Sequence, residues 1–141
     1  MMSNSGVRRQ VEEVEFRISE PVSDEALNCL FANAWEAHAE RSFQPVLSKS
    51  LLYVCAYKGE ELVGFVNVAT DGGQHAFILD TCVHDRLRKK GIGKALVREA
   101  IEAASKRGIT WVHVDYEPKL LHFYEACGFR ASAAGVLRVG A

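Results

Sequence analysis

The sequence lacks any apolar run that approaches the roughly 20 residues needed to span a bilayer. It also lacks an apolar segment behind Arg8 and Arg9, where a secretory signal peptide would need one. These two absences predict a cytoplasmic protein with no membrane partner. Residues 1–10 are polar, and we expect them to be disordered.

Cysteine is sparse and irregularly spaced. The four residues of this type form no C-x-x-C pair: Cys29, Cys55, Cys82 and Cys127. This pattern favours reduced, buried thiols over a disulfide framework or a zinc site. His113 and Asp115 lie two positions apart, but no third ligand stands at a useful spacing, so we predict no metal.

An excess of either charge is also missing, because 17 Lys and Arg residues face 18 Asp and Glu residues. This balance gives no general attraction to nucleic acid, so an anionic ligand needs a local cluster of positive groups. Hydrophobic residues make up 48% and charged residues 25%, as in soluble globular proteins. The length of 141 residues fits a single domain over residues 1–141.

Hydrophobic periodicity and turn residues predict the secondary structure. The first half is predicted to hold a strand at 14–18, a helix capped by Ser23, a second helix or kinked extension at 34–41 that ends by Pro45, and strands at 51–57, 62–69 and 75–83. The second half is predicted to hold a helix at 91–108, a strand at 109–114, a helix at 118–128 and a hairpin at 129–139. This order indicates an α/β (α+β) fold with a mixed, mostly antiparallel sheet of six to seven strands and about four helices on both faces.

The most informative segment is the loop between the strand at 75–83 and the helix that follows it. The loop reads Arg88-Lys89-Lys90-Gly91-Ile92-Gly93-Lys94, with Arg86 just before it. Its two glycines let the backbone approach a bulky anion. The helix that begins there leaves its first N–H groups unpaired and points its positive end at the loop. Together with the basic side chains, these features predict a pyrophosphate-binding loop.

Two common nucleotide-binding motifs do not fit this loop. A Walker loop requires Ser or Thr after Gly93-Lys94, where this sequence has Ala95, and a further Gly five positions before Gly93. A Rossmann fingerprint requires Gly or Ala where Leu96 stands. A protein that binds ATP or NAD through either motif is therefore disfavoured.

The same residues match the pattern Arg/Gln-x-x-Gly-x-Gly/Ala. Together with Val83 upstream and the later Phe123-Tyr124-Glu125-Ala126-Cys127-Gly128-Phe129, they resemble the GNAT superfamily of N-acetyltransferases, most strongly over 51–130. The resemblance implies a splayed sheet with acetyl-CoA wedged beside the strand that ends Thr81-Cys82-Val83. It assigns the pantetheine arm to the backbone of Thr81, Cys82 and Val83. It assigns the pyrophosphate to Arg88, Lys89, Lys90, Gly91, Ile92, Gly93 and Lys94.

The resemblance also assigns Tyr124 the protonation of the departing CoA thiolate. The alternative is that Tyr124 is a core aromatic beside Phe123. For the base that accepts the proton of the amine, Asp80 and Glu117 rank equally and Asp115 follows them. The alternative for each is a capping or solvent-exposed carboxylate. Glu117 stands where the family often has Asn.

The sequence therefore predicts an N-acetyltransferase that moves the acetyl group of acetyl-CoA to a primary amine by direct attack in a ternary complex. The acceptor is a small amine or a peptide amine. A non-catalytic acyl-CoA-binding or regulatory module is the alternative. The resemblance places Trp35, His38, Arg41 and Phe43 in the acceptor segment, with packing as the alternative for Trp35 and Phe43. An exposed terminal hairpin would offer a surface for a homodimer.

Overall fold

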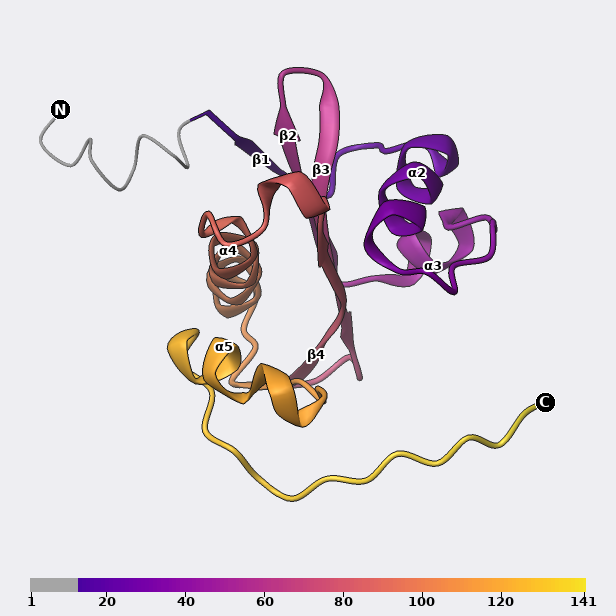
Figure 1. Ribbon diagram of the computed structural model, residues 1–141. Coiled ribbons are helices and arrows are strands. Elements are labelled where there is room, and N and C mark those ends of the chain that lie inside the picture. Colours follow the sequence, from indigo (N-terminus) through magenta and orange to yellow (C-terminus); the bar gives the residue numbers. More distant parts are fainter. Residues whose placement is uncertain (1–12) are drawn as a thin grey trace, which may run out of the picture.

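A five-stranded sheet in the order β1-β2-β3-β4-β5 forms the centre of the protein (Figure 1). The computed structural model describes residues 13–141, so the expectation for residues 1–10 lies outside it. The strands are β1 (Glu15–Ile18), β2 (Leu52–Lys58), β3 (Glu61–Thr70), β4 (His75–Val83) and β5 (Trp111–His113). The first four pair antiparallel, and β5 pairs parallel to β4. The predicted mixed, mostly antiparallel sheet is confirmed.

Helices cover both faces of this sheet, as predicted. Figure 1 shows α4 (Ile92–Lys106) and α5 (Leu121–Ala126) on one face, and α2 (Asp24–Ala34) and α3 (Gln44–Lys49) on the other. Two 3₁₀ turns, η1 (Asp85–Leu87) and η2 (Pro118–Leu120), precede α4 and α5. Each main face buries its own apolar cluster. Within residues 13–141, no helix is long and apolar enough to cross a membrane.

Helix α4 packs very closely on the sheet. Its buried side chains Leu96, Ala100 and Ala104 share one cluster with Val66 of β3. Gly64 of β3 permits the approach, because a Cβ at that position would lie 2.8 Å from Leu96 Cδ1. This contact fixes the start of α4 beside the end of β4, which is where the basic loop lies.

The predicted number of six to seven strands is wrong, because the described sheet has five. The expected hairpin at 129–139 is not formed, and residues 130–141 contain no strand. Its apolar side chains Val136, Leu137 and Val139 are 80%, 83% and 92% exposed. A hairpin needs one buried apolar face for stability, and these side chains bury none. The hairpin on which the predicted homodimer rested is therefore absent from this part of the chain.

The helix predicted at 34–41 is also misplaced, because the second helix is α3. The Asn28 side chain binds both backbone groups of Arg41, with Nδ2 2.7 Å from its carbonyl oxygen and Oδ1 3.0 Å from its amide. These bonds replace the helical hydrogen bonds that Arg41 would make. Pro45 lies in the first turn of α3, where a missing N–H does no harm, so it helps to start a helix rather than to end one.

Candidate active site

Strand β4 is paired on both edges at its start and on one edge at its end. Its pairing with β5 runs only from His75 to Phe77, whereas its pairing with β3 continues to Val83. The His84 amide donates to Val63 O at 2.8 Å, so alternation turns the backbone of Cys82 toward β3 as well. The backbone groups of Thr81 and Val83 then point toward the open edge. Of the three residues that the resemblance assigns to pantetheine, Thr81 and Val83 direct backbone groups to the open edge, and Cys82 directs its backbone groups to β3.

A β-bulge interrupts β4 at this open edge. Two steps along β3, from Phe65 to Asn67, match three steps along β4, from Cys82 to Leu79. Asp80 lies in the extra segment with φ +59°, a left-handed conformation that few non-glycine residues adopt. Bulges of this kind redirect side chains and are frequent beside active sites.

The Asp80 carboxyl combines access with a high proton affinity. The side chain is exposed, yet the protein around it raises the pKa of its carboxyl above the ordinary value, because desolvation disfavours the charge. The positive charge of Arg41 opposes this shift. Arg41 belongs to the segment between α2 and α3, so Asp80 faces the same side of the sheet as α2. An accessible carboxylate with a raised pKa has the properties of a general base.

Tyr124 lies on α5 with 6% of its surface exposed. Its ring stacks on Tyr116 with centroids 4.8 Å apart, and the Phe123 and Phe129 rings meet it edge-on. Burial raises the pKa of the Tyr124 phenol above its usual range, and the nearby Thr81 hydroxyl opposes this shift. The phenol therefore keeps its proton at neutral pH, beside the open edge of β4.

The Thr81 hydroxyl itself is an orphaned polar group. Oγ1 is buried and makes no well-formed hydrogen bond within the described chain, although the Tyr124 phenol is its neighbour. Buried polar groups are rarely left without a partner. This hydroxyl therefore suits a polar ligand at the open edge.

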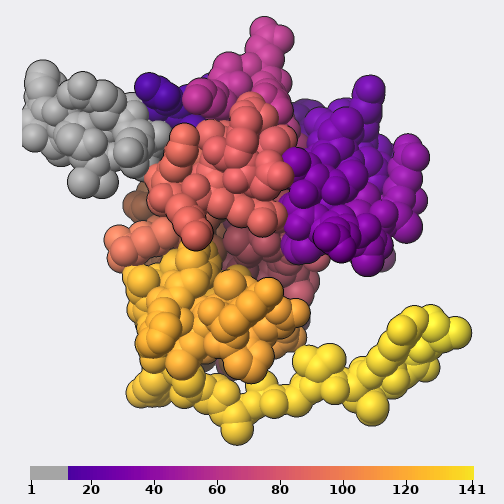
Figure 2. Space-filling view, viewed as in Figure 1, coloured from indigo at the N-terminus to yellow at the C-terminus, as the bar shows by residue number. Residues whose placement is uncertain are grey.

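The loop before α4 presents unpaired backbone amides. Gly91 caps the helix with φ +88°, and Lys89 has φ +65°. The first helical bond runs from the Ala95 amide to Gly91 O at 3.0 Å, so the amides of Ile92, Gly93 and Lys94 have no partner within residues 13–141. Figure 2 shows this loop at the surface between the α2–α3 region and α5. The amides and the positive end of the helix dipole favour an anion here.

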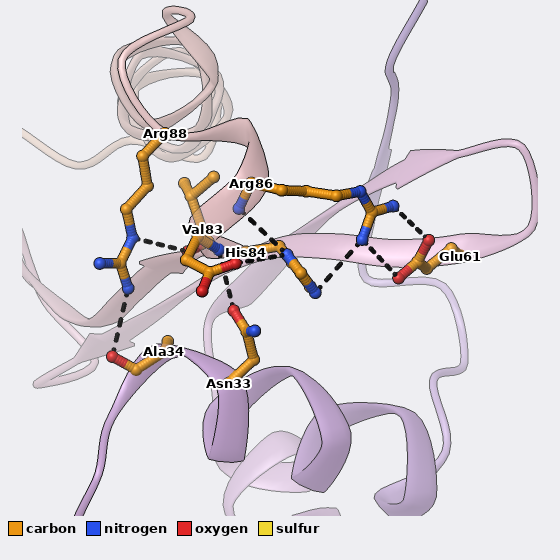
Figure 3. A network of polar contacts seen from close by, with 8 residues as sticks. Asn33, Ala34, Glu61, Val83, His84, Arg86 and Arg88 are labelled. Atoms are coloured by element: carbon orange, nitrogen blue, oxygen red, sulfur yellow. Dashed lines mark hydrogen bonds and ion pairs between the residues drawn. The ribbon is translucent and has the colours of Figure 1, made fainter.

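The basic side chains of the loop divide into two groups. Arg88 donates through Nε to Val83 O and through Nη2 to Ala34 O, both at 3.2 Å (Figure 3). Arg86 pairs with Glu61 through both ends of its guanidinium, and this pairing lowers the pKa of the Glu61 carboxyl. The lysines at 89, 90 and 94 are exposed and form no ion pair with residues 13–141. The arginines thus position the loop, and the lysines supply its free charge.

Asn33 of α2 is a positioning residue that the sequence did not reveal. Its Oδ1 accepts a hydrogen bond from the Asp85 amide at 2.8 Å (Figure 3). The two residues are 52 positions apart, and neither belongs to a recognisable local motif. Together with the Arg88 bond to Ala34, this contact fastens the end of α2 to the loop.

The remaining carboxylate candidates lie on the segment after β5. Strand β5 ends at His113, so Asp115 and Glu117 lie beyond the strand, and both side chains are exposed. Glu117 is exposed and pairs with Lys119 at 3.5 Å. The charge of Asp115, by contrast, contributes to the raised pKa of Tyr124. Asp115 is therefore electrostatically coupled to the phenol, although the sequence ranked it behind Glu117.

The predicted acceptor segment divides between packing and exposure. Phe43 is 3% exposed and belongs to the core beneath α2 and α3, so the packing alternative holds for it. Trp35 is 39% exposed at the end of α2. His38 hydrogen-bonds to Asn28 Oδ1 at 2.8 Å. Among residues 13–141, no three His, Cys, Asp or Glu side chains are grouped to hold a metal ion.

Comparison with known proteins identifies the family of the chain. The model of the acetyltransferase (GNAT) family matches residues 19–129. The chain belongs to this family. A curated relative, the uncharacterised N-acetyltransferase YvbK of Bacillus subtilis, is 36% identical over 81 residues, which are 55% of this chain and 52% of that protein. The mycothiol acetyltransferase of Nocardia farcinica is 34% identical over 88 residues, 60% of this chain and 29% of that protein. This GNAT chain thus spans about half the length of YvbK and less of the Nocardia enzyme.

Solved structures extend the match over the whole fold. A GNAT-family acetyltransferase of Streptococcus pneumoniae has a TM-score of 0.74 and 22% identity, covering 90% of this chain and 98% of that one. A Bacillus subtilis acetyltransferase solved in complex with CoA has a TM-score of 0.68 and 28% identity, covering 85% and 78%. The first likeness shows the GNAT fold, and the second is to an acetyltransferase solved in complex with CoA.

Proposed function

We propose that this GNAT domain transfers the acetyl group of acetyl-CoA to a primary amine. One observation carries the proposal: the open edge of β4 lies beside the protonated Tyr124 phenol and leads into the loop of unpaired amides before α4. A ligand with an amide-rich arm and a diphosphate matches this sequence of features. The relative solved with CoA supports the same choice of ligand.

The residues along this edge fit acetyl-CoA. The backbone groups of Thr81 and Val83 would pair with the pantetheine amides, in the way that a neighbouring strand would. The amides at positions 92–94, with Lys89, Lys90 and Lys94, would hold the pyrophosphate. When bound, acetyl-CoA supplies an acyl group activated as a thioester. A backbone N–H of β4 directed at the thioester oxygen would stabilise the tetrahedral intermediate, and loss of such a donor elsewhere costs about 3–4 kcal/mol.

The reaction needs two proton transfers. Asp80 accepts a proton as the amine nitrogen attacks the thioester carbonyl, and it does so directly or through a water. The carbon–sulfur bond then breaks, and Tyr124 donates its proton to the sulfur. The products are an amide and free CoA. Asp80 is favoured over Glu117 as the base because its pKa is raised, while Glu117 pairs with Lys119.

Direct attack is favoured over an acyl-cysteine intermediate. A nucleophilic cysteine needs a lowered pKa. Burial instead raises the pKa of the Cys55 thiol to about 12, and it raises the pKa values of Cys82 and Cys127 as well. These three thiols are therefore protonated and poor nucleophiles at neutral pH.

Calorimetric titration with CoA and acetyl-CoA, followed by assays of CoA release with a set of amines, tests the proposal. We expect saturable binding of both forms and amine-dependent release of CoA. Thermal shifts with ATP and NAD serve as controls and should be absent. Binding without release for any amine would favour an acyl-CoA-binding module, and no binding would contradict the proposal.

A further inference from the structure

One side of the β4–β5 pair carries four rings and a leucine that lie outside the buried clusters under the helices. We call this surface the aromatic face and define it as His75, Phe77, Leu79, Trp111 and His113. The residues between them, Ala76, Ile78 and Val112, pack in the α4 cluster, so alternation turns the face toward the side of α2 and α3. The buried cluster beneath α2 and α3 includes Cys82 of β4 and no member of the aromatic face.

Three rings of the aromatic face stack on one another, and the face contains no Asp, Glu, Lys or Arg. The His113 ring stacks between His75 and Phe77, with centroids 5.0 and 4.9 Å away. His75 Nδ1 lies 2.7 Å from His113 Nε2, so the two rings are also joined by a hydrogen bond. Phe77, Leu79 and Trp111 are 38%, 44% and 57% exposed. Exposed apolar side chains gathered on one side of a strand pair are a candidate binding surface.

The aromatic face leads directly to the proposed base. Leu79 immediately precedes Asp80, and Phe77 lies about 10 Å away along the strand. Arg41 lies close enough for its charge to act on the Asp80 carboxyl. The two groups carry opposite charges, so the site offers one carboxylate to one ammonium group and no excess of negative charge to attract a polycation.

We propose that the acceptor is a primary monoamine joined by a short chain to a flat aromatic group. The ring lies on Phe77 and Trp111, and the amine lies beside Asp80 at the open edge of β4. Ring-on-ring contact supplies the affinity, because offset or edge-on aromatic pairs attract beyond their burial of apolar area. The inference rests on the acyl transfer proposed above, and it names the substrate class of that site.

The test compares a ring-bearing monoamine with a ringless monoamine and with a polyamine. The rate of CoA release is measured with 2-phenylethylamine, n-propylamine and spermidine. We expect kcat/KM for 2-phenylethylamine to exceed the other two values by about tenfold, the size of one good aromatic contact. Equal values for the ring-bearing and ringless amines would overturn the inference, as would a preference for spermidine.

Variants assign the effect to the aromatic face. Phe77→Leu and Trp111→Leu should each lower kcat/KM for 2-phenylethylamine about fivefold, the loss of part of one aromatic contact. The loss for n-propylamine, which has no ring to contact, should be smaller. Val136→Ala, which trims an 80% exposed apolar side chain of the C-terminal segment, is the matched control and should change neither amine. An equal loss for both amines would contradict a specific ring contact.

A binding measurement separates this inference from the proposed function. The sequence contains two tryptophans, so Trp35→Phe leaves Trp111 as the sole indole reporter. We expect 2-phenylethylamine, but not n-propylamine, to change the Trp111 fluorescence saturably, whether or not CoA binds. If CoA binding fails while this change persists, the acyl-transfer proposal fails alone. If no change occurs, or if sedimentation shows a dimer that Trp111→Leu dissociates, the aromatic face has another occupant and the inference is wrong.

Discussion

The two halves of strand β4 differ in what they leave free. At His75–Phe77 the strand is paired on both edges, and the aromatic side chains on one face are exposed. At 78–83 it is paired on one edge, carries the bulge at Asp80, and turns backbone groups of Thr81 and Val83 outward. The first half therefore offers side chains to a ligand, and the second half offers backbone.

This difference separates two kinds of recognition within one strand. Backbone amides and carbonyls are the same for every sequence, so the second half of β4, whose edge is open, suits a ligand shared by the whole GNAT family. Side chains vary, so the first half, which is paired on both edges, suits the substrate that differs between members. Asp80 and Tyr124 lie near the junction of the two halves, where the proposed thioester and amine would meet.

Of the changes beside the second half of β4, Tyr124→Phe should lower turnover the most. Removing a general acid should lower kcat about 100-fold, since such groups contribute about 10²–10⁴-fold. Affinity for CoA should not change, because the ring and its packing remain. Stopped-flow rates and calorimetry measure the two quantities.

Tyr116→Phe is the matched control for this change. The Tyr116 ring stacks on Tyr124 at 4.8 Å but has no assigned proton transfer, so its kcat should remain normal. If Tyr124→Phe keeps full turnover across neutral pH, Tyr124 is a packing residue and the thiolate obtains its proton elsewhere.

Gly91→Ala tests the backbone of the loop. An L-residue at φ +88° costs roughly 1–2 kcal/mol, so we expect about tenfold weaker CoA binding and a lower melting temperature. Gly93→Ala provides the comparison, because its Cβ would meet the Phe123 ring at an ordinary 3.4 Å within a helix. Alanine there should keep CoA affinity and raise stability by up to about 1 kcal/mol. Equal losses for the two variants would show that conformation at Gly91 is not the cause.

Removing the free charge of the loop should have a smaller effect. Lys89→Gln combined with Lys90→Gln should weaken CoA binding about two- to fivefold, since fully exposed charges contribute about 0.2–0.5 kcal/mol each, the lower part of the range for surface ion pairs. The loss should shrink as salt screens the charges. Lys106→Gln, at the far end of α4 and paired with Glu102 at 3.7 Å, is the control and should not affect CoA. A loss that is independent of salt would indicate a structural role for the two lysines.

Local patterns predicted much of this fold and the location of the loop. The alternation at 75–83 and the glycines at 91 and 108 place β4 and α4 where the structure has them. Ser23 accepts from the Ala26 amide at 3.0 Å, as a predicted N-cap should. These features depend on neighbours within one turn or one strand, so the sequence contains them directly.

Features that depend on distant residues were not predictable in this way. The start of α3 depends on Asp24, whose Oδ1 accepts the Phe43 amide at 2.9 Å, and the non-helical Arg41 depends on Asn28. The basic loop was assigned five cations, yet Arg86 and Arg88 are engaged by Glu61 and by two carbonyls. The terminal hairpin failed because β-propensity alone does not supply a buried face.

The smallest expected effect is the change in the melting temperature of the protein when Asp80 is replaced. The pKa of the Asp80 carboxyl is raised in the folded state, so folding favours the protonated form. That stabilising contribution is present below the unfolded-state pKa and is lost as pH rises through the folded-state pKa. Asp80→Asn removes the unfavourable charge, and Asn also tolerates φ +59°. The melting temperature at neutral pH should therefore rise by about 1–3 °C, with no rise in strong acid.

The same variant also tests whether Asp80 is the catalytic base. If Asp80 is the base, Asp80→Asn should lose turnover and gain stability. Such a trade-off is expected where an active site retains a charged residue that destabilises the fold. Glu117→Gln should change neither quantity, since Glu117 is exposed and its partner Lys119 is exposed as well. A lower melting temperature for Asp80→Asn at neutral pH would mean that the attraction of Arg41 outweighs desolvation. Asp80 would then be a structural ion-pair partner, and the base would have to be sought at Asp115, whose charge acts on Tyr124.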